Sequence, residues 1–263
     1  MANLEFDDEA SRLVEEFNAS AGATLRRARI ADALALKPGD RVLDVGSGPG
    51  HQAFELSPIV GPTGSVDGVD PADSALEISR RRCSDLENVS FQGGTASELP
   101  FEDLTFDAVM SSQVFEYLPD VAGGLEEMFR VLKPGGRVLV HDTDWGALLW
   151  HSSDKDRMAR LMEIWDGHLV YPHLPQSLGR KLADAGFENI RAEGIVHAET
   201  DYDPSSMSAV LLKFVVGYLV SQGVSQTEVD AWADDLNALA TSGNYFYSSN
   251  EYIFTADKPM SAA

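Results

Sequence analysis

Short apolar runs alternate with longer amphipathic stretches through the first half of the chain. The short runs, bounded by glycine or proline turns, predict strands at 41–45, 65–70, 88–92, 105–111 and 137–141. Between them, apolar positions at helical spacing predict helices at 51–59, 71–83 and 120–132. Strands and helices that alternate in this way are typical of a parallel, doubly wound α/β sheet.

The rest of the chain follows a different pattern. A helix is predicted at 4–33, before the first strand. After residue 142 the pattern predicts helices at 153–168, 174–185, 203–220 and 225–240, and strands at 190–200 and 245–255. We expect a single domain over 1–263. Its predicted parts are an N-terminal helical segment at 1–35, a binding core at 36–144, and a helical cap at 145–186 and 203–243.

The first predicted strand ends in a glycine loop, Gly46-Ser47-Gly48-Pro49-Gly50, that opens a helix. Such a loop lets backbone N–H groups approach a ligand closely. Asp70 ends the second strand, where an acid accepts hydrogen bonds from ribose hydroxyls. Asp44 precedes the loop, and its carboxylate suits an ammonium or a sulfonium better than a phosphate. The pattern therefore favours S-adenosylmethionine over NAD, and an NAD dehydrogenase remains an alternative.

The charge and cysteine content restrict the function further. The formal net charge is −22, which repels nucleic acid and anionic membrane surfaces. A surface of this sign also suits a protein from a high-salt habitat, which we treat as a hypothesis. Cys83 is the one cysteine of the chain, so an internal disulfide and a thiolate metal cluster are excluded.

The chain start and the longest apolar run bear on location. The first residues are acidic and lack the pattern of a signal peptide. The apolar run at 207–220 contains Lys213 and is too short to span a bilayer. We therefore expect a cytoplasmic protein without stable membrane insertion. The run is predicted to form a buried cap helix, a dimer surface or the roof of an acceptor pocket, and the protein is expected to be a monomer or homodimer.

Several motifs together resemble the class I S-adenosylmethionine-dependent methyltransferases, and among them the UbiE-like small-molecule group. The resemblance covers about residues 36–144. It rests on the glycine loop with its preceding strand, Gly68-Val69-Asp70, Leu99-Pro100-Phe101 with Thr105-Phe106-Asp107, and Arg130-Val131-Leu132-Lys133-Pro134-Gly135-Gly136. The resemblance implies a seven-stranded, Rossmann-like sheet whose last strand, matching 245–255, is antiparallel.

The resemblance also implies a set of cofactor-binding residues. The residues implied to hold S-adenosylmethionine, and S-adenosylhomocysteine as product, are Asp44, Gly46, Ser47, Gly48, Gly50, Asp70, Pro71, Thr95, Ala96, Ser111, Ser112 and Gln113. Two positions depart from the family pattern. Thr95 stands where an acid is usual, and Tyr117 stands where a histidine is frequent, so a base at that position is in doubt.

Methyl transfer from a sulfonium is an in-line displacement that depends mainly on alignment and on exclusion of water. A general base is needed only when the acceptor must lose a proton. The candidates are His141, which closes the fifth predicted strand, His151 and Tyr117. Aromatic residues are predicted to line the acceptor site, with ordinary core packing as the alternative: Trp145, Trp150, Trp165, His168, Tyr171, Phe214 and Tyr218.

A metal site is not predicted. Asp142 and Asp144 have the chemistry to bind magnesium, but no further ligands complete the set. His168 and His173 are five residues apart and lack the helical i, i+4 spacing. We therefore predict methylation of an oxygen or carbon of a small, partly apolar aromatic, quinone or polyketide-like molecule. The alternatives are N-methylation of a small amine and a non-catalytic S-adenosylmethionine-binding regulatory or assembly module.

Overall fold

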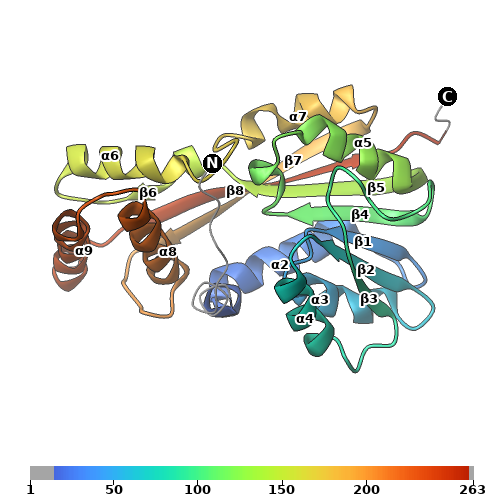
Figure 1. Ribbon diagram of the computed structural model, residues 1–263, viewed down its shortest axis with the longest axis horizontal. Helices are drawn as coiled ribbons and strands as arrows, with labels where there is room; N and C mark the ends of the chain where they lie inside the picture. Colours follow the sequence, from blue (N-terminus) through green and yellow to red (C-terminus); the bar gives the residue numbers. More distant parts are fainter. Residues whose placement is uncertain (1–14, 261–263) are drawn as a thin grey trace. The chain divides into compact units, whose positions relative to one another are not determined.

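The computed structural model describes residues 15–260. Within that range one mixed sheet has eight strands, ordered β3-β2-β1-β4-β5-β8-β6, with β7 also paired to β8 (Figure 1). The strands are β1 (Arg41–Val45), β2 (Ser65–Asp70), β3 (Val89–Gly93), β4 (Phe106–Ser112), β5 (Leu132–Thr143), β6 (Leu149–Trp150), β7 (Glu188–Glu199) and β8 (Tyr247–Asp257).

The helices agree closely with the apolar periodicity. They are α2 (Ala21–Leu34), α3 (His51–Val60), α4 (Asp73–Arg82), α5 (Val121–Val131), α6 (Lys155–Asp166), α7 (Pro175–Asp184), α8 (Met207–Ser221) and α9 (Gln226–Thr241), with 3₁₀ turns η1 (Phe115–Tyr117) and η2 (Trp145–Ala147). No helix among residues 15–260 has the length and apolar run that crossing a membrane requires.

Three sequence predictions need correction. The helix predicted at 4–33 is interrupted at Ser20. The Ser20 hydroxyl accepts a hydrogen bond from Ala23 N (3.2 Å) and caps the start of α2. Residues 4–14 of that prediction lie outside the described range. β5 begins at Leu132, five residues early, because Leu132 pairs with Phe106 before the glycine turn. The sheet has eight described strands instead of seven, because the two-residue β6 pairs antiparallel with β8 and is too short to show periodicity.

The contacts divide the chain into two compact units, which we describe separately. The larger unit comprises residues 27–143, 173–194 and 252–260, and the smaller comprises 15–26, 144–172 and 195–251. In the larger unit β1 pairs in parallel with both β2 and β4. Right-handed crossovers on either side of β1 therefore place α3 and α4 on one face of the sheet and α5 on the other (Figure 1).

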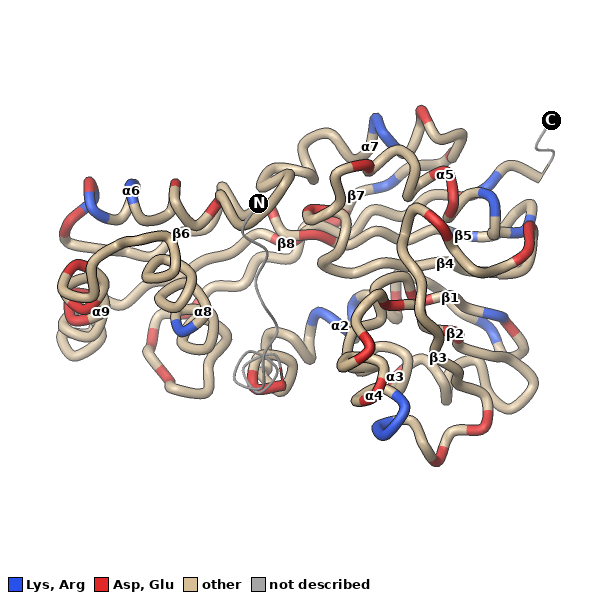
Figure 2. The backbone as a smooth tube through the Cα atoms, in the orientation of Figure 1, with Lys and Arg blue, Asp and Glu red and all other residues tan. Residues whose placement is uncertain are grey.

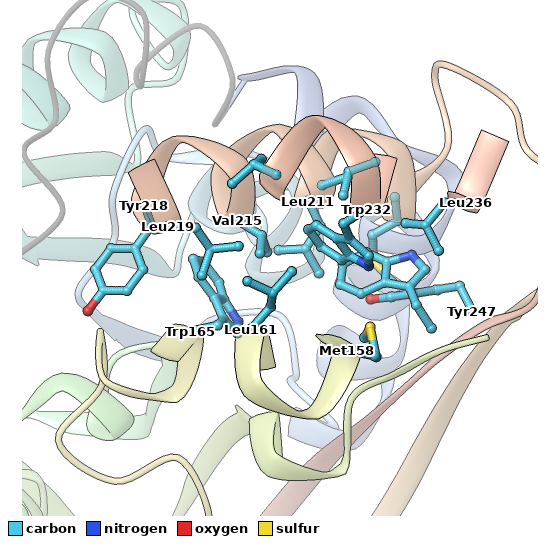
Figure 3. Packing of buried hydrophobic residues seen from close by; sticks show 14 of the residues in the cluster. Met158, Leu161, Trp165, Leu211, Val215, Tyr218, Leu219, Trp232, Leu236 and Tyr247 are labelled. Atoms are coloured by element: carbon cyan, nitrogen blue, oxygen red, sulfur yellow. The ribbon is translucent and has the colours of Figure 1, made fainter. Parts of the chain in front are cut away.

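The smaller unit is built around an apolar cluster from α6, α8, α9 and β8 (Figure 3). Trp165 and Trp232 are almost wholly buried in it, and Val215 and Leu219 of α8 pack beside them. The apolar run at 207–220 therefore forms a buried helix. Burial of large aromatic side chains contributes about 1.5–3 kcal/mol each before entropy costs are counted, so this cluster is the main source of stability of the unit.

The negative charge predicts a stability that depends on salt. Figure 2 shows acidic residues along both units, with a compact basic run at the end of α4. At a net charge of −22, self-repulsion opposes the folded state and dissolved salt screens it. We expect the melting temperature to rise by several degrees between low and molar sodium chloride, as measured by differential scanning fluorimetry. An unchanged melting temperature would argue against adaptation to high salt.

Candidate functional site

The candidate site lies at the carboxyl ends of the parallel strands in the larger unit. Strand order reverses between β1 and β4, and ligands of open α/β sheets bind outside the strand ends at such a point. Asp44 lies near the end of β1, and Gly46 comes directly after that strand. Asp70 ends β2, Ser112 ends β4, and His141 lies near the end of β5. The fold therefore brings together residues that the sequence separates by nearly one hundred positions.

The glycine loop after β1 is held by backbone hydrogen bonds. Gly46 N and Ser47 N both donate to Val69 O, at 2.7 and 3.0 Å. Gly46 has a φ of +75°, and a Cβ added there would lie 2.3 Å from Val114 Cγ2. Gly48 has a φ of +50°, and a Cβ added there would meet nothing within 4 Å. Gly46 is thus required by close packing, whereas Gly48 faces open space where a ligand can approach the backbone.

Asp70 organises the same loop from β2. Its Oδ2 accepts a hydrogen bond from Gly48 N (2.9 Å), and its Oδ1 accepts one from Ala72 N (2.8 Å). A carboxylate has about four lone-pair directions, so these two bonds leave acceptor capacity for ribose hydroxyls. Asp70 therefore combines a loop-shaping role with the ribose role expected of it.

Asp44 is a buried carboxyl group that lacks a full set of partners. The residue is 2% exposed, and its Oδ2 has no hydrogen-bond partner among residues 15–260. Burial, and then the negative charge of Asp70, raises the pKa of Asp44 to about 7. An unpaired buried carboxylate is costly, and a bound cation compensates it. The residues present therefore fit the amino-acid end of S-adenosylmethionine, which carries an ammonium and a sulfonium.

The remaining residues expected to bind the cofactor have mixed surroundings. Thr95 is exposed, with its hydroxyl 3.3 Å from Ser97 Oγ, and Ala96 is buried. Pro71 is exposed at the start of the turn into α4. Ser111 is fully buried and donates its hydroxyl hydrogen to Val45 O (2.9 Å), which ties β4 to β1. The Ser111 side chain thus stabilises the pairing of β4 with β1.

Gln113 stands directly after β4 in a conformation that favours glycine. Its φ is +59°. Its backbone N donates to His141 O (2.8 Å), and its Nε2 donates to Thr143 Oγ1 (2.7 Å). Strained non-glycine residues of this kind cluster at functional sites, where the surrounding contacts enforce them. Here the contacts bind the turn after β4 to the end of β5.

The three candidate bases have different surroundings. His141 in the larger unit is fully buried, and its Nδ1 lies 3.0 Å from Ser112 Oγ. Tyr117 in the same unit is 39% exposed. The pKa of its hydroxyl is raised well above the usual value, first by burial of the group and then by the Glu116 and Asp142 carboxylates. His151 belongs to the smaller unit, where it is exposed and its Nδ1 lies 2.9 Å from Asn244 O.

The sequence interpretation missed one residue at this edge of the sheet. Glu116 in η1 is fully buried, and its Oε2 accepts a hydrogen bond from Thr143 N (3.3 Å). The available signal was an acid within the apolar stretch Val114-Phe115-Glu116-Tyr117-Leu118. Asp142, considered only as a magnesium ligand, is also fully buried. Among residues 15–260 no group of three or more histidine, cysteine or acidic side chains has the arrangement of a metal site.

The residues predicted for the acceptor all belong to the smaller unit, and four of them form one aromatic cluster. The rings of Trp165 and His168 lie 3.8 Å apart between centroids, and Trp145 and Tyr218 contact them edge-on. Burial lowers the pKa of His168 to about 4, against the opposing effect of the Trp165 carbonyl, so its ring is neutral at physiological pH. The indole N–H groups of Trp145 and Trp165 have no hydrogen-bond partner within the described range.

The other predicted acceptor residues lie outside that aromatic group. Trp150 packs against Trp232 and Tyr247, and its indole N–H donates to Tyr245 Oη (3.1 Å). Phe214 is half-buried against the apolar cluster of the unit, and Tyr171 is half-buried. Trp150 therefore has the contacts of a core residue, and Trp165 is almost wholly buried in the same cluster, although its indole N–H has no partner among the described residues.

Comparisons with known proteins identify relatives of the chain. A family model described as a methyltransferase domain matches residues 36–194. A 37.1 kDa protein of transposon Tn4556 from Streptomyces fradiae is 33% identical over 181 residues, which are 68% of this chain and 52% of that protein. The demethylmenaquinone methyltransferase of Staphylococcus aureus is 41% identical over 117 residues, 44% of this chain and 48% of that enzyme. The chain thus spans about half the length of these curated relatives.

Solved structures show the same fold at low sequence identity. The YcgJ protein of Bacillus subtilis has a TM-score of 0.63 and 22% identity, over 90% of this chain and 99% of that one. The phosphoethanolamine N-methyltransferase 2 of Haemonchus contortus, in complex with S-adenosyl-L-methionine, has a TM-score of 0.64 and 20% identity, over 97% of this chain and 58% of that one. At these identities the similarity concerns the fold alone.

Proposed function

Because the chain belongs to the methyltransferase-domain family, we propose that it is an S-adenosylmethionine-dependent methyltransferase. The acceptor that we propose is an oxygen or carbon atom of a small, partly apolar molecule of the aromatic, quinone or polyketide type. The observation that carries the proposal is the buried, partly unpartnered Asp44 carboxyl group beside the glycine loop and Asp70. The similarity to a demethylmenaquinone methyltransferase over 117 residues supports the acceptor class.

Each residue of the larger unit has a defined task in this proposal. When bound, S-adenosylmethionine supplies a methyl group activated by its sulfonium. Asp44 would neutralise the positive amino-acid end, and Asp70 would hold the ribose while keeping Gly48 N in place. Thr95 and Ala96 would border the adenine. Methyl transfer needs little covalent chemistry from the protein, so alignment by this rigid strand edge is the main contribution to catalysis.

The acceptor side is proposed to involve the aromatic cluster of the smaller unit. The unpartnered indole N–H groups of Trp145 and Trp165 suit carbonyl, hydroxyl or phenolate oxygens, and the neutral His168 ring suits an uncharged acceptor. His141, Tyr117 and His151 remain the proposed bases for an acceptor that must lose a proton. The Tyr117 residue is 39% exposed, but its hydroxyl group is buried and has a raised pKa, and His141 is fully buried, so each base would need the acceptor to reach a buried group.

Calorimetry and a transfer assay test this function in order. We expect S-adenosylmethionine and S-adenosylhomocysteine to bind and NADH not to bind. We also expect methyl transfer to reduced naphthoquinones or catechols, in a panel that includes small amines. Binding of NADH alone would refute the proposal. Transfer only to amines would show that the acceptor is a small amine and not an oxygen or carbon atom. Cofactor binding without transfer to any acceptor would favour a regulatory or assembly module.

Cofactor affinity is expected to depend on pH through Asp44. The pKa of this carboxyl group is about 7 in the folded protein, and a positively charged ligand favours the ionised form. Cofactor affinity should therefore strengthen by up to about tenfold per pH unit as pH rises toward 7, and it should level off above pH 7. Titration calorimetry between about pH 5.5 and 8 measures this, and a flat profile would contradict the role of Asp44.

A further inference from the structure

Two buried carboxyl groups cross-link the turn after β4 to the end of β5. Asp142 Oδ1 accepts a hydrogen bond from Val114 N (3.2 Å), and Glu116 Oε2 accepts one from Thr143 N (3.3 Å). Each acid thus bonds to the backbone of the segment that carries the other. Together with the two bonds from Gln113, these contacts fix residues 113–116 against residues 141–143.

These carboxyl groups lie in surroundings that oppose a double negative charge. Glu116 and Asp142 are both 0% exposed, and in the described part of the chain Asp142 Oδ2 has no hydrogen-bond partner. Burial, and then the neighbouring Glu116 carboxylate, raises the pKa of Asp142 well above its usual value. Two carboxyl groups that share a dry site retain one proton between them, because ionisation of the first disfavours ionisation of the second.

The cross-linked turn bears directly on the glycine loop. A Cβ at Gly46 would lie within 3.3 Å of three Val114 side-chain atoms, so Val114 forms the surface against which the loop rests. Phe115, the next residue, packs on Gly124 of α5, where an added Cβ would lie 3.0 Å from its ring. A shift of this turn would therefore move the side chain of Val114, on which the glycine loop at Gly46 rests.

We propose that Glu116 and Asp142 act as one singly protonated pair that positions the Val114–Tyr117 turn, and through Val114 the glycine loop. Both are positioning residues, because both are fully buried and bond to the backbone of the turn and of β5. The effect on cofactor affinity rests on the proposed function, whereas the shared proton does not. The other titratable groups at this edge are Tyr117 on the turn, and His141 and Asp144 around the end of β5.

The pair has a pH signature opposite in sign to that of Asp44. Ionisation of Asp44 strengthens binding of a cationic ligand as pH rises through about 7. Loss of the shared proton at alkaline pH places two repelling charges in the cross-link, loosens the turn and weakens binding. Affinity should therefore rise, level off and then decline as pH increases, and the decline belongs to Glu116 and Asp142.

Infrared spectroscopy of the ligand-free protein tests the shared proton directly. At about pH 9 the wild type should retain the carbonyl stretching band of a protonated carboxyl group, because ordinary acids and Asp44 are ionised there. Glu116→Gln combined with Asp142→Asn should remove that band, and the matched control Asp44→Asn should leave it. Absence of the band in wild type would overturn the proposal, and no variant has to fold for that result.

Cofactor titration of the same variants tests the positioning role. Glu116→Gln is isosteric and keeps the contact to Thr143 N through its amide oxygen, so the dissociation constant should stay within about 3-fold of wild type while the alkaline decline disappears. Glu116→Ala, which cannot bridge, should weaken binding about 10-fold or more. An alkaline decline that persists in Glu116→Gln would refute the pair as its origin. If wild type binds no S-adenosylmethionine, the proposed function fails, and the infrared result still decides whether the pair exists.

Discussion

Asp44→Asn is expected to weaken S-adenosylmethionine binding by at least about 100-fold and, at pH 8, to stabilise the ligand-free protein. The two effects have one cause. The residue is 2% exposed, and its Oδ2 lacks a partner among the described residues. Its negative charge therefore destabilises the folded state, and a cationic ligand offsets this effect. Asparagine keeps the size of the side chain and removes the charge that attracts the ligand. Loss of one buried charged contact weakens binding by about 3 kcal/mol.

The sign of the stability change follows from proton linkage. The pKa of Asp44 is about 7 in the folded protein, against the ordinary value of 3.8. A raised carboxyl pKa lowers stability progressively as pH increases from about 4 to 7, and the full loss, a few kcal/mol, persists above pH 7. Below pH 4 the group is protonated in both states and contributes no difference. The stabilisation by Asp44→Asn should therefore vanish at low pH.

Thermal unfolding at pH 8 and below pH 4 without ligand measures the stability change, and calorimetry at pH 8 measures the binding change. Asp70→Asn is the informative comparison. Both Asp70 oxygens accept backbone hydrogen bonds, so that variant should lose stability as well as affinity. Destabilisation by Asp44→Asn at pH 8 would show that the Asp44 carboxylate is compensated within the protein, against the assignment of a cationic ligand to it.

The sequence predicted the core of the larger unit well because local and long-range signals agree there. Each parallel strand is a short apolar run that ends in a turn, so its carboxyl end, and with it Asp44, Asp70 and His141, can be placed without coordinates. The glycine loop is readable because positive φ angles are costly for other residues, and three of its residues are glycines.

Other features of the site depend on tertiary contacts that no local pattern encodes. Ser111 looks like a site residue in the sequence, yet its hydroxyl bonds to Val45 O across the β1–β4 ladder. Glu116 was overlooked because one acid in an apolar stretch does not reveal that Thr143, 27 positions later, donates to it. Trp165, Phe214 and Tyr218 lie on helices as predicted, but helical spacing could not show that Trp165 is buried in the core cluster while its indole N–H lacks a partner among the described residues. Trp150 lies in β6, a strand that was not predicted, and it also packs in the core.

Gly46→Ala is expected to reduce both stability and cofactor affinity far more than Gly48→Ala, although both glycines have positive φ. A Cβ at residue 46 would lie 2.3 Å from Val114 Cγ2, whereas a Cβ at residue 48 would meet nothing within 4 Å. Both variants carry the left-handed backbone cost of about 1–2 kcal/mol. Only Gly46→Ala adds the overpacking cost of about 1–3 kcal/mol, because either Val114 or the loop must move.

A compensating substitution separates the packing effect from the backbone effect. Val114→Ala removes the two methyl groups that the new Cβ would meet, so Gly46→Ala combined with Val114→Ala should recover most of the overpacking loss and retain the backbone cost. Gly48→Ala combined with Val114→Ala should show no recovery. Chemical denaturation and S-adenosylmethionine titration of this double-mutant cycle measure the coupling. Equal losses in the two single variants would mean that backbone strain alone governs the loop, and that Val114 does not set its position.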